Sequence, residues 1–145
     1  MSKKMLEAVT AARESRDWSR VVEAIPYARY LALAVDHTEG DFVCKLPFAD
    51  RLIGNPGLPA LHGGAIGALL ESTAVLMLLS RMETIVLPKT ITLTVDYLLS
   101  GRPADTFAAG AITRLGRRVA NVNVVAWQTE REKPIATAIA HFLLE

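Results

Sequence analysis

The stretch from Leu61 to Arg81 constrains the fold of this chain more than any other segment. It is almost entirely apolar, it opens with a His62-Gly63-Gly64 corner, and it contains a single carboxylate, Glu71. A helix this apolar is expected to be covered by a sheet. A charged side chain inside such a helix costs several kcal/mol unless it is paired or hydrogen-bonded. The segment therefore predicts a central helix that carries a functional site at Glu71.

The other segments predict an α+β domain around this helix. Apolar residues at helical spacing run from about Lys3 to Ala24, and Pro26 ends that run. Alternating patterns predict strands at 30–37, 41–48, 90–97, 106–113, 119–129 and a last one through Phe142, the final four in a meander. We expect one domain over 1–145, with an N-terminal amphipathic helix within 1–25 and the central helix over 61–81.

Charge and residue spacing argue against several classes of protein. The net charge of +1 argues against a nucleic-acid-binding protein, which usually gathers a strong basic excess on one face. His62 and Glu71 lie within the apolar stretch and Arg81 follows it, which argues against a membrane span. The His, Asp and Glu residues show no metal-ligand spacing, so we predict no metal and no cofactor.

The single cysteine and the polar N-terminus indicate a compartment. Cys44 cannot form an internal disulfide, and we expect it to pack as a small hydrophobic residue. The chain begins with polar and charged residues, without the apolar core of a secretion signal. We therefore expect a reducing, cytoplasmic location.

Helix geometry predicts that the two ends of the apolar motif act in different protomers. Nine residues separate His62 from Glu71, which puts them about 13 Å apart and on opposite sides of the helix. A second, antiparallel copy would bring Glu71 of one chain towards Gly63 of the other, in two equivalent sites. Gly63, Gly64 and Gly67 would let a partner or ligand approach closely, unless they serve packing against the chain's own sheet.

The order and spacing of these motifs resemble the hotdog-fold acyl-CoA thioesterases, in particular the phenylacetate-pathway and 4-hydroxybenzoyl-CoA type. His62-Gly63-Gly64 is followed at the right distance by Glu71, and later motifs match at Tyr97-Leu98, Gly101 and 114–118. The resemblance covers roughly 30–144. It implies a single hotdog domain, in which an antiparallel sheet wraps around the long central helix. It also implies hydrolysis of an acyl-CoA thioester to free acid and CoA, in a homodimer with both active sites at the interface. A further pairing of dimers into a tetramer stays open.

The same resemblance assigns catalytic roles at the start and middle of the helix. Backbone N–H groups at Gly63 and Gly64 lie at the positive end of the helix dipole, where they can stabilise an oxyanion. The family residue that matches Gly63 donates this hydrogen bond. Glu71 would act either as general base on water or as direct nucleophile, and the sequence does not decide between them.

Three further residues have a catalytic and a structural interpretation. His62 is either a general acid or base, or a corner residue whose hydrogen bonds to the backbone fix the turn. Asn55 matches an Asn that orients the attacking water or the carbonyl, at a spacing one residue longer than usual, and it also suits a turn before Pro56. Thr90 would complete the site from the strand after the helix, although alternating Thr residues also suit a half-exposed strand.

Candidate binding residues come from a basic corner and from the helix middle. Arg114, Arg117 and Arg118 suit the phosphates of the coenzyme, or form a solvated turn. We expect the acyl pocket to be formed by the partner chain together with Ser72, Val75, Leu76, Trp18, Tyr27 and Tyr30.

Two rival functions stay open. The loop at 54–59 resembles that of acyl-carrier-protein dehydratases, which favours a hotdog dehydratase or hydratase, but Arg51 stands where those enzymes need a His. The other rival is a non-catalytic acyl-CoA-binding module, in which Glu71 only pairs across the dimer.

Overall fold

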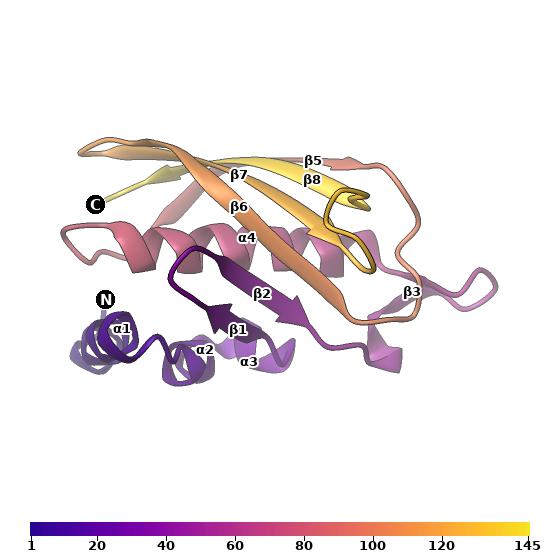
Figure 1. Cartoon of the computed structure of the whole chain (residues 1–145), viewed down its shortest axis with the longest axis horizontal. Coiled ribbons are helices and arrows are strands. Elements are labelled where there is room, and N and C mark those ends of the chain that lie inside the picture. The colour runs from indigo at the N-terminus through magenta and orange to yellow at the C-terminus, as the bar shows by residue number, and fades with distance from the viewer.

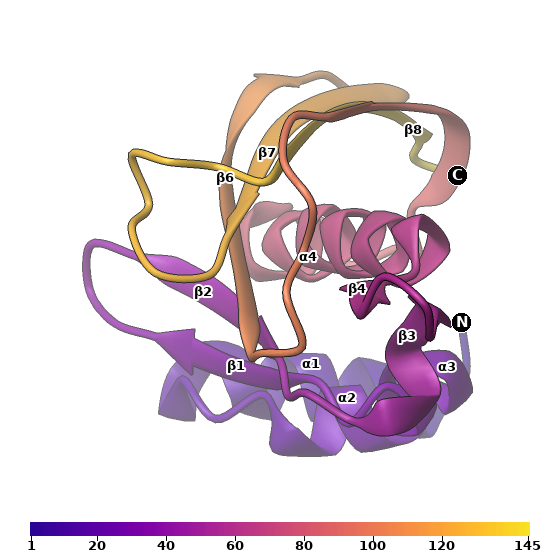
Figure 2. The ribbon, with the colours of Figure 1, turned by 90° about the vertical axis from the view of Figure 1, so that its right-hand side faces the viewer.

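The computed structural model describes residues 1–145 and is built around one long helix, α4 (Gly63–Arg81). A curved six-stranded sheet wraps over one side of α4, and the N-terminal helices lie on the opposite side (Figure 1; Figure 2). The central helix and the surrounding sheet predicted from the sequence are confirmed. The helix itself begins at Gly63 because the two preceding residues belong to a strand and a cap.

All strand pairs in the main sheet are antiparallel, in the order β1-β2-β6-β7-β8-β5. Two further short strands form a separate hairpin, in which Ile53 pairs with Leu61. The strands are β1 (Ala34–His37), β2 (Phe42–Leu46), β3 (Ile53–Asn55), β4 (Ala60–Leu61), β5 (Lys89–Tyr97), β6 (Thr106–Leu115), β7 (Val119–Trp127) and β8 (Ala136–Leu143). A 3₁₀ turn, η1 (Asp50–Leu52), precedes β3.

The prediction that the last four strands form a meander is wrong for the first of them, β5. β5 pairs with β8 at the edge of the sheet, and only β6, β7 and β8 form a meander. A tight hairpin cannot follow β5, because the chain crosses past the end of α4 before β6 begins. The N–H groups of Leu98 and Leu99 anchor that crossing by donating to the C=O of Ile135.

The single N-terminal helix predicted over Lys3 to Ala24 is divided. It forms α1 (Lys3–Ser15) and α2 (Ser19–Ala24), and Pro26 opens a third helix, α3 (Pro26–Tyr30). Arg16 ends α1 in the left-handed region, with φ at 62°, and the Asp17 carboxylate accepts the N–H of Ser19 to start α2.

The strand predicted from residue 30 begins only at Ala34. Tyr30 ends α3, and Ala32 has a positive φ of 54°, which breaks any extended run. The other predicted strands differ from the structure only at their ends.

Small side chains on the inner face of the sheet let α4 pack closely against it. Leu69 and Leu70 of α4 are fully buried. The facing strand positions are mostly alanines with almost no exposure: Ala108, Ala120, Ala126, Ala136, Ala138 and Ala140. By length and composition α4 could cross a membrane, but 56% of its most apolar window is buried inside the protein.

Trp18 and Cys44 both belong to the core. Trp18 is 1% exposed, its Nε1 donates to Nδ1 of His37 at 3.0 Å, and its ring meets Phe42 edge to face. The expectation that Trp18 lines an acyl pocket is therefore wrong, because the indole is fully enclosed by the chain's own residues. Cys44 packs in the core as predicted, and burial raises the pKa of its thiol to about 12.

Arg13 ties the N-terminal helices to α4. Its Nε and Nη2 donate to the C=O of Leu79 at 2.8 and 2.5 Å, in the last turn of α4. A cation is favourable at this end of a helix. We expect Arg13→Met to lower the free energy of unfolding by about 2 kcal/mol, as for other hydrogen bonds to charged groups. Urea titrations of this variant and of Arg20→Met, an exposed arginine on α2, measure the difference. Equal losses in both variants would contradict a specific role for Arg13.

His37 makes stability depend on pH. Burial, with the positive charges of Arg16 and Arg81, lowers the pKa of His37, and its Nδ1 can accept from Trp18 only when that nitrogen carries no proton. Around the pKa, His37 binds more protons in the unfolded chain than in the folded one. Its contribution to the free energy of unfolding is therefore fully present above the unfolded pKa of about 6.5, and is lost as the pH falls below that value. Thermal unfolding at pH 7.5 and pH 5.5 should show a smaller decrease in Tm for His37→Gln than for the unmodified protein. The same decrease in both would show that other groups cause it.

Candidate active site

His62 fixes the start of α4. Its Nδ1 accepts the N–H of Gly64 at 2.8 Å, and its C=O accepts the N–H groups of Ala65 and Ile66. Its own N–H donates to the C=O of Leu52 at 2.8 Å. The structure thus gives His62 the role of a helix cap. It also corrects the expectation that Gly64 offers a free N–H, because the His62 ring already accepts it.

Gly63 is the first residue of α4, and its N–H donates to no other group in the chain. Unpaired N–H groups at this end of a helix form an anion site. The C=O of Gly63 accepts the hydroxyl of Tyr97 at 2.7 Å. A Cβ on Gly63 would lie 3.2 Å from the Tyr97 ring, so this glycine accommodates the chain's own tyrosine.

Tyr97 is the residue that sequence reasoning missed. The Tyr97-Leu98 pair was one of the motifs of the family resemblance, and that was its only signal, because a strand-end tyrosine also suits ordinary packing. Gly67 touches the same phenol less closely, since a Cβ there would lie 3.5 Å from the Tyr97 hydroxyl. Tyr97 therefore covers the first turn of α4 from the end of β5.

Glu71 lies half-buried in the middle of α4 and contacts the next strand. The hydroxyl of Thr90 on β5 donates to Oε1 of Glu71 at 2.6 Å. Oε2 of Glu71 accepts no hydrogen bond within the chain, and no lysine or arginine pairs with this carboxylate. The structure thus brings Glu71 and Thr90 together and leaves one carboxylate oxygen free to act on a water or a substrate.

Glu71 and Gly63 remain apart within one protomer. Both belong to the same continuous helix, so the spacing of about 12 Å between them follows from the rise per residue. A cavity of about 370 Å³, lined mostly by hydrophobic residues, lies beside Gly63 and not beside Glu71. It is lined by Ala60, Leu61, Gly63, Ile66 and the stretch from Tyr97 to Gly101.

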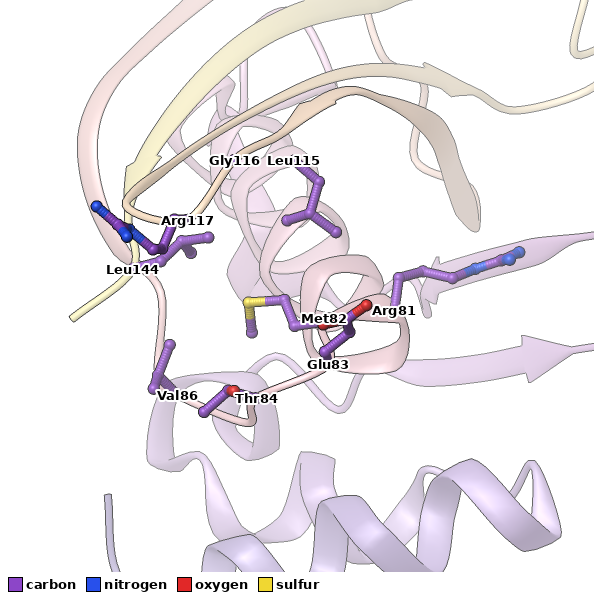
Figure 3. A pocket seen from close by; sticks show the side chains of 9 residues that line it. All are labelled: Arg81, Met82, Glu83, Thr84, Val86, Leu115, Gly116, Arg117 and Leu144. Carbon is purple, nitrogen blue, oxygen red and sulfur yellow. The ribbon is translucent and has the colours of Figure 1, made fainter.

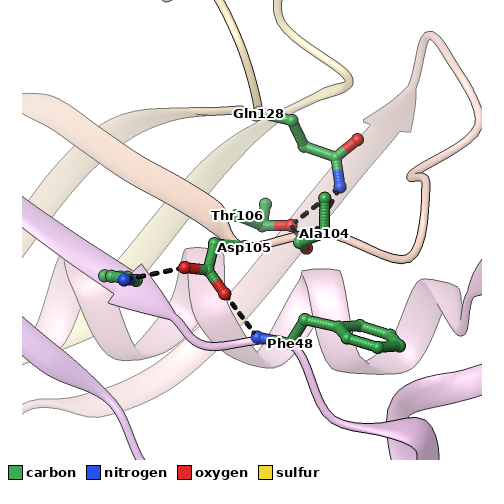
Figure 4. Close-up of polar contacts among 6 residues, drawn as sticks. Phe48, Ala104, Asp105, Thr106 and Gln128 are labelled. Carbon is green, nitrogen blue, oxygen red and sulfur yellow. Dashed lines mark hydrogen bonds and ion pairs between the residues drawn. The ribbon is translucent and has the colours of Figure 1, made fainter.

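A polar network holds the loop that borders this cavity. The Gln128 amide donates to the C=O of Arg102 and accepts its N–H, both at 2.9 Å. The same amide donates to the Thr106 hydroxyl at 3.2 Å, and Asp105 accepts the N–H of Phe48 at 2.8 Å (Figure 4). The hydrogen bonds from Lys45 and Phe48 lower the pKa of the Asp105 carboxyl. These contacts fix the loop between β5 and β6, and with it one wall of the cavity.

Asn55 has a structural contact in its own hairpin. Its Oδ1 accepts the N–H of Gly57 at 3.0 Å, which closes the turn between β3 and β4. No hydrogen bond links Asn55 to Glu71 or Gly63. Ser72 and Val75 are half-buried on α4, close in sequence to Glu71.

The arginine corner lies at the other end of the helix. Arg114, Arg117 and Arg118 are exposed at the turn between β6 and β7, and Arg118 pairs with Glu145 at 3.1 Å. Arg117 and Arg81 border a cavity of about 580 Å³ at the C-terminal end of α4 (Figure 3). Gly63 and Arg81 stand at opposite ends of α4, about 27 Å apart. Within one protomer, the arginine corner is therefore separated from Gly63 by nearly the whole length of this helix.

Comparisons with known proteins concern the fold and the family of this chain. A model of the thioesterase superfamily matches residues 58–135, more than half of the chain, including all of α4. No curated protein matches the sequence. Among solved structures, a protein from Chromobacterium violaceum is 37% identical with a TM-score of 0.77, over 96% of this chain and 97% of that one.

Two more distant structures share the fold. A phenylacetic acid degradation-related protein from Ralstonia eutropha JMP134 is 22% identical, with a TM-score of 0.75, over 87% of this chain and 98% of that one. A thioesterase from Staphylococcus aureus, solved as a mutant, is 20% identical, with a TM-score of 0.73, over 83% and 99%. The sheet wrapped around α4 is the hotdog-type fold, as predicted. The chain belongs to the thioesterase superfamily, and this membership supports hydrolysis of acyl thioesters in general.

Proposed function

We propose that this protein hydrolyses acyl-CoA thioesters to free acid and CoA, as a homodimer with two active sites between protomers. The observation that carries the proposal is the division of one catalytic set along α4. The free N–H of Gly63 suits an oxyanion, and the Thr90-bound carboxylate of Glu71 suits a general base or nucleophile; a thioester hydrolase needs both. The two groups lie too far apart to act on one substrate within a single chain.

The exposed edge of the sheet supports such a dimer. β5 pairs with β8 on one side only, and Ile91 on this strand is 55% exposed. An unpaired edge strand readily pairs with a second copy of itself. A two-fold axis at this edge runs the two copies of β5 antiparallel and sets the two α4 helices side by side, so that Glu71 approaches Gly63 of the other protomer.

The chemistry follows from these two groups. The thioester oxygen accepts the Gly63 N–H and gains negative charge when the carbonyl carbon is attacked. Glu71 either takes a proton from the attacking water or attacks directly to form an anhydride that water then cleaves. The C–S bond breaks in either route, and the thiolate of CoA leaves and takes up a proton. Thr90 holds Oε1, which keeps Oε2 directed to the reaction.

An assay of thiol release tests the proposal. The purified protein is incubated with short, medium and aromatic acyl-CoA substrates, and free CoA is measured with a thiol reagent. We expect hydrolysis of at least one substrate, by a species whose light-scattering mass equals that of a dimer or a tetramer. A folded protein that releases no CoA from any of them, or an active monomer, would contradict the proposal. Conversion of an enoyl-CoA to its 3-hydroxy product, without CoA release, would favour the hydratase instead.

A further inference from the structure

An aromatic surface lies on α3, outside the site described above. The rings of Tyr27 and Tyr30 stack with centroids 5.8 Å apart and planes 12° apart. Both residues are 56% exposed, although an aromatic side chain usually buries most of its area. The sequence predicts that both tyrosines line an acyl pocket formed together with the partner chain. Within the single chain, their stacked rings form an open surface.

A cation without a carboxylate partner borders these rings. The guanidinium of Arg51 lies 5.3 Å from the centroid of the Tyr30 ring, and its Nη2 donates to the C=O of Tyr30 at 2.8 Å. Arg51 forms no ion pair within the chain. Its remaining N–H groups are therefore held beside the aromatic surface and are available to an anion.

This surface is connected to the start of α4 by a short path. Arg51 is followed by Leu52, whose C=O accepts the N–H of His62, and His62 directly precedes Gly63. The path from Arg51 through Leu52 and His62 to Gly63 has three steps, which together span about 10 Å. A flexible pantetheine arm with a diphosphate can cover that separation.

We propose that Tyr27, Tyr30 and Arg51 bind the adenosine bisphosphate end of coenzyme A. The adenine stacks on the exposed tyrosine rings, and Arg51 binds a phosphate oxygen. Stacking on aromatic side chains and arginine contacts to phosphate are the usual means of holding a nucleotide on an open surface. This inference rests on the proposed function, because it places the thioester of the same coenzyme at Gly63. It adds a second contact region to the arginine corner expected from the sequence.

Two substrates and three variants test the inference. Tyr27→Ala and Arg51→Gln are compared with Lys133→Gln, which removes a positive charge from the exposed turn between β7 and β8. Each is assayed with an acyl-CoA and with the same acyl group on N-acetylcysteamine, which lacks the nucleotide. We expect kcat/KM for the acyl-CoA to fall about tenfold in the first two variants and to stay unchanged for the truncated substrate. Lys133→Gln should match the unmodified protein with both substrates.

Calorimetric titration with adenosine 3′,5′-bisphosphate separates this inference from the proposed function. Weaker binding to Tyr27→Ala and Arg51→Gln supports the surface, even if no thioester is hydrolysed. Equal losses with both substrates, or unchanged kinetics and unchanged nucleotide binding in these variants, would overturn the inference and leave the hydrolysis proposal intact.

Discussion

Glu71→Gln is expected to lower kcat for acyl-CoA hydrolysis about a thousandfold. An amide of the same size can neither take a proton from water nor attack a thioester. The fold should persist, because the Thr90 hydroxyl can donate to the amide oxygen as it does to Oε1 of the carboxylate. Initial rates of thiol release measure the loss, and circular dichroism verifies folding.

A matched variant distinguishes this from a general loss of charge. Glu132→Gln removes a carboxylate from the exposed turn between β7 and β8 and should retain full activity. Substrate binding should survive in Glu71→Gln. Activity close to that of the unmodified protein in Glu71→Gln would show that the carboxylate only stabilises the structure.

The kcat of Gly63→Pro is expected to be about a hundredfold lower, or more, than the kcat of Gly63→Ala. Proline is well accepted as the first residue of a helix, and it removes the N–H that we assign to the oxyanion. Both substitutions add a Cβ near the Tyr97 ring, but only proline deletes the donor. Comparing kcat of the two variants therefore isolates the contribution of the N–H group.

Gly67→Ala completes that series. A Cβ at this position would be in ordinary contact with the Tyr97 hydroxyl at 3.5 Å, and alanine favours the helix. This variant should keep its activity and its Tm. Equal activity of Gly63→Pro and Gly63→Ala would remove the Gly63 N–H from the mechanism.

The sequence predicted the central helix well because several local signals agreed there. A capping His62, a continuous apolar run and a following Arg81 favour the same segment. The family resemblance predicted that Thr90 completes the site, and the structure shows its hydroxyl in contact with Glu71. What the sequence could not show was the partner of β5, because strand periodicity defines a face but not a neighbour.

Other features depend on tertiary contacts that leave no pattern in the chain. The break at Arg16 lies inside a run with helical spacing, where packing overrides propensity. The burial of Trp18 depends on His37 and Phe42, which follow it at a distance in sequence. The glycine at 63 predicted a close approach, but only the structure shows that Tyr97 makes it.

A dimer formed from two inactive chains tests the central claim most directly. Glu71→Gln and Gly63→Pro chains are co-expressed with different affinity tags, and the mixed dimer is isolated by sequential purification. One of its two sites combines an intact Glu71 with the intact Gly63 of the other chain, so the account predicts about half of the activity of the unmodified dimer. Activity no higher than that of the two parent variants would show that Glu71 and Gly63 do not act across the interface.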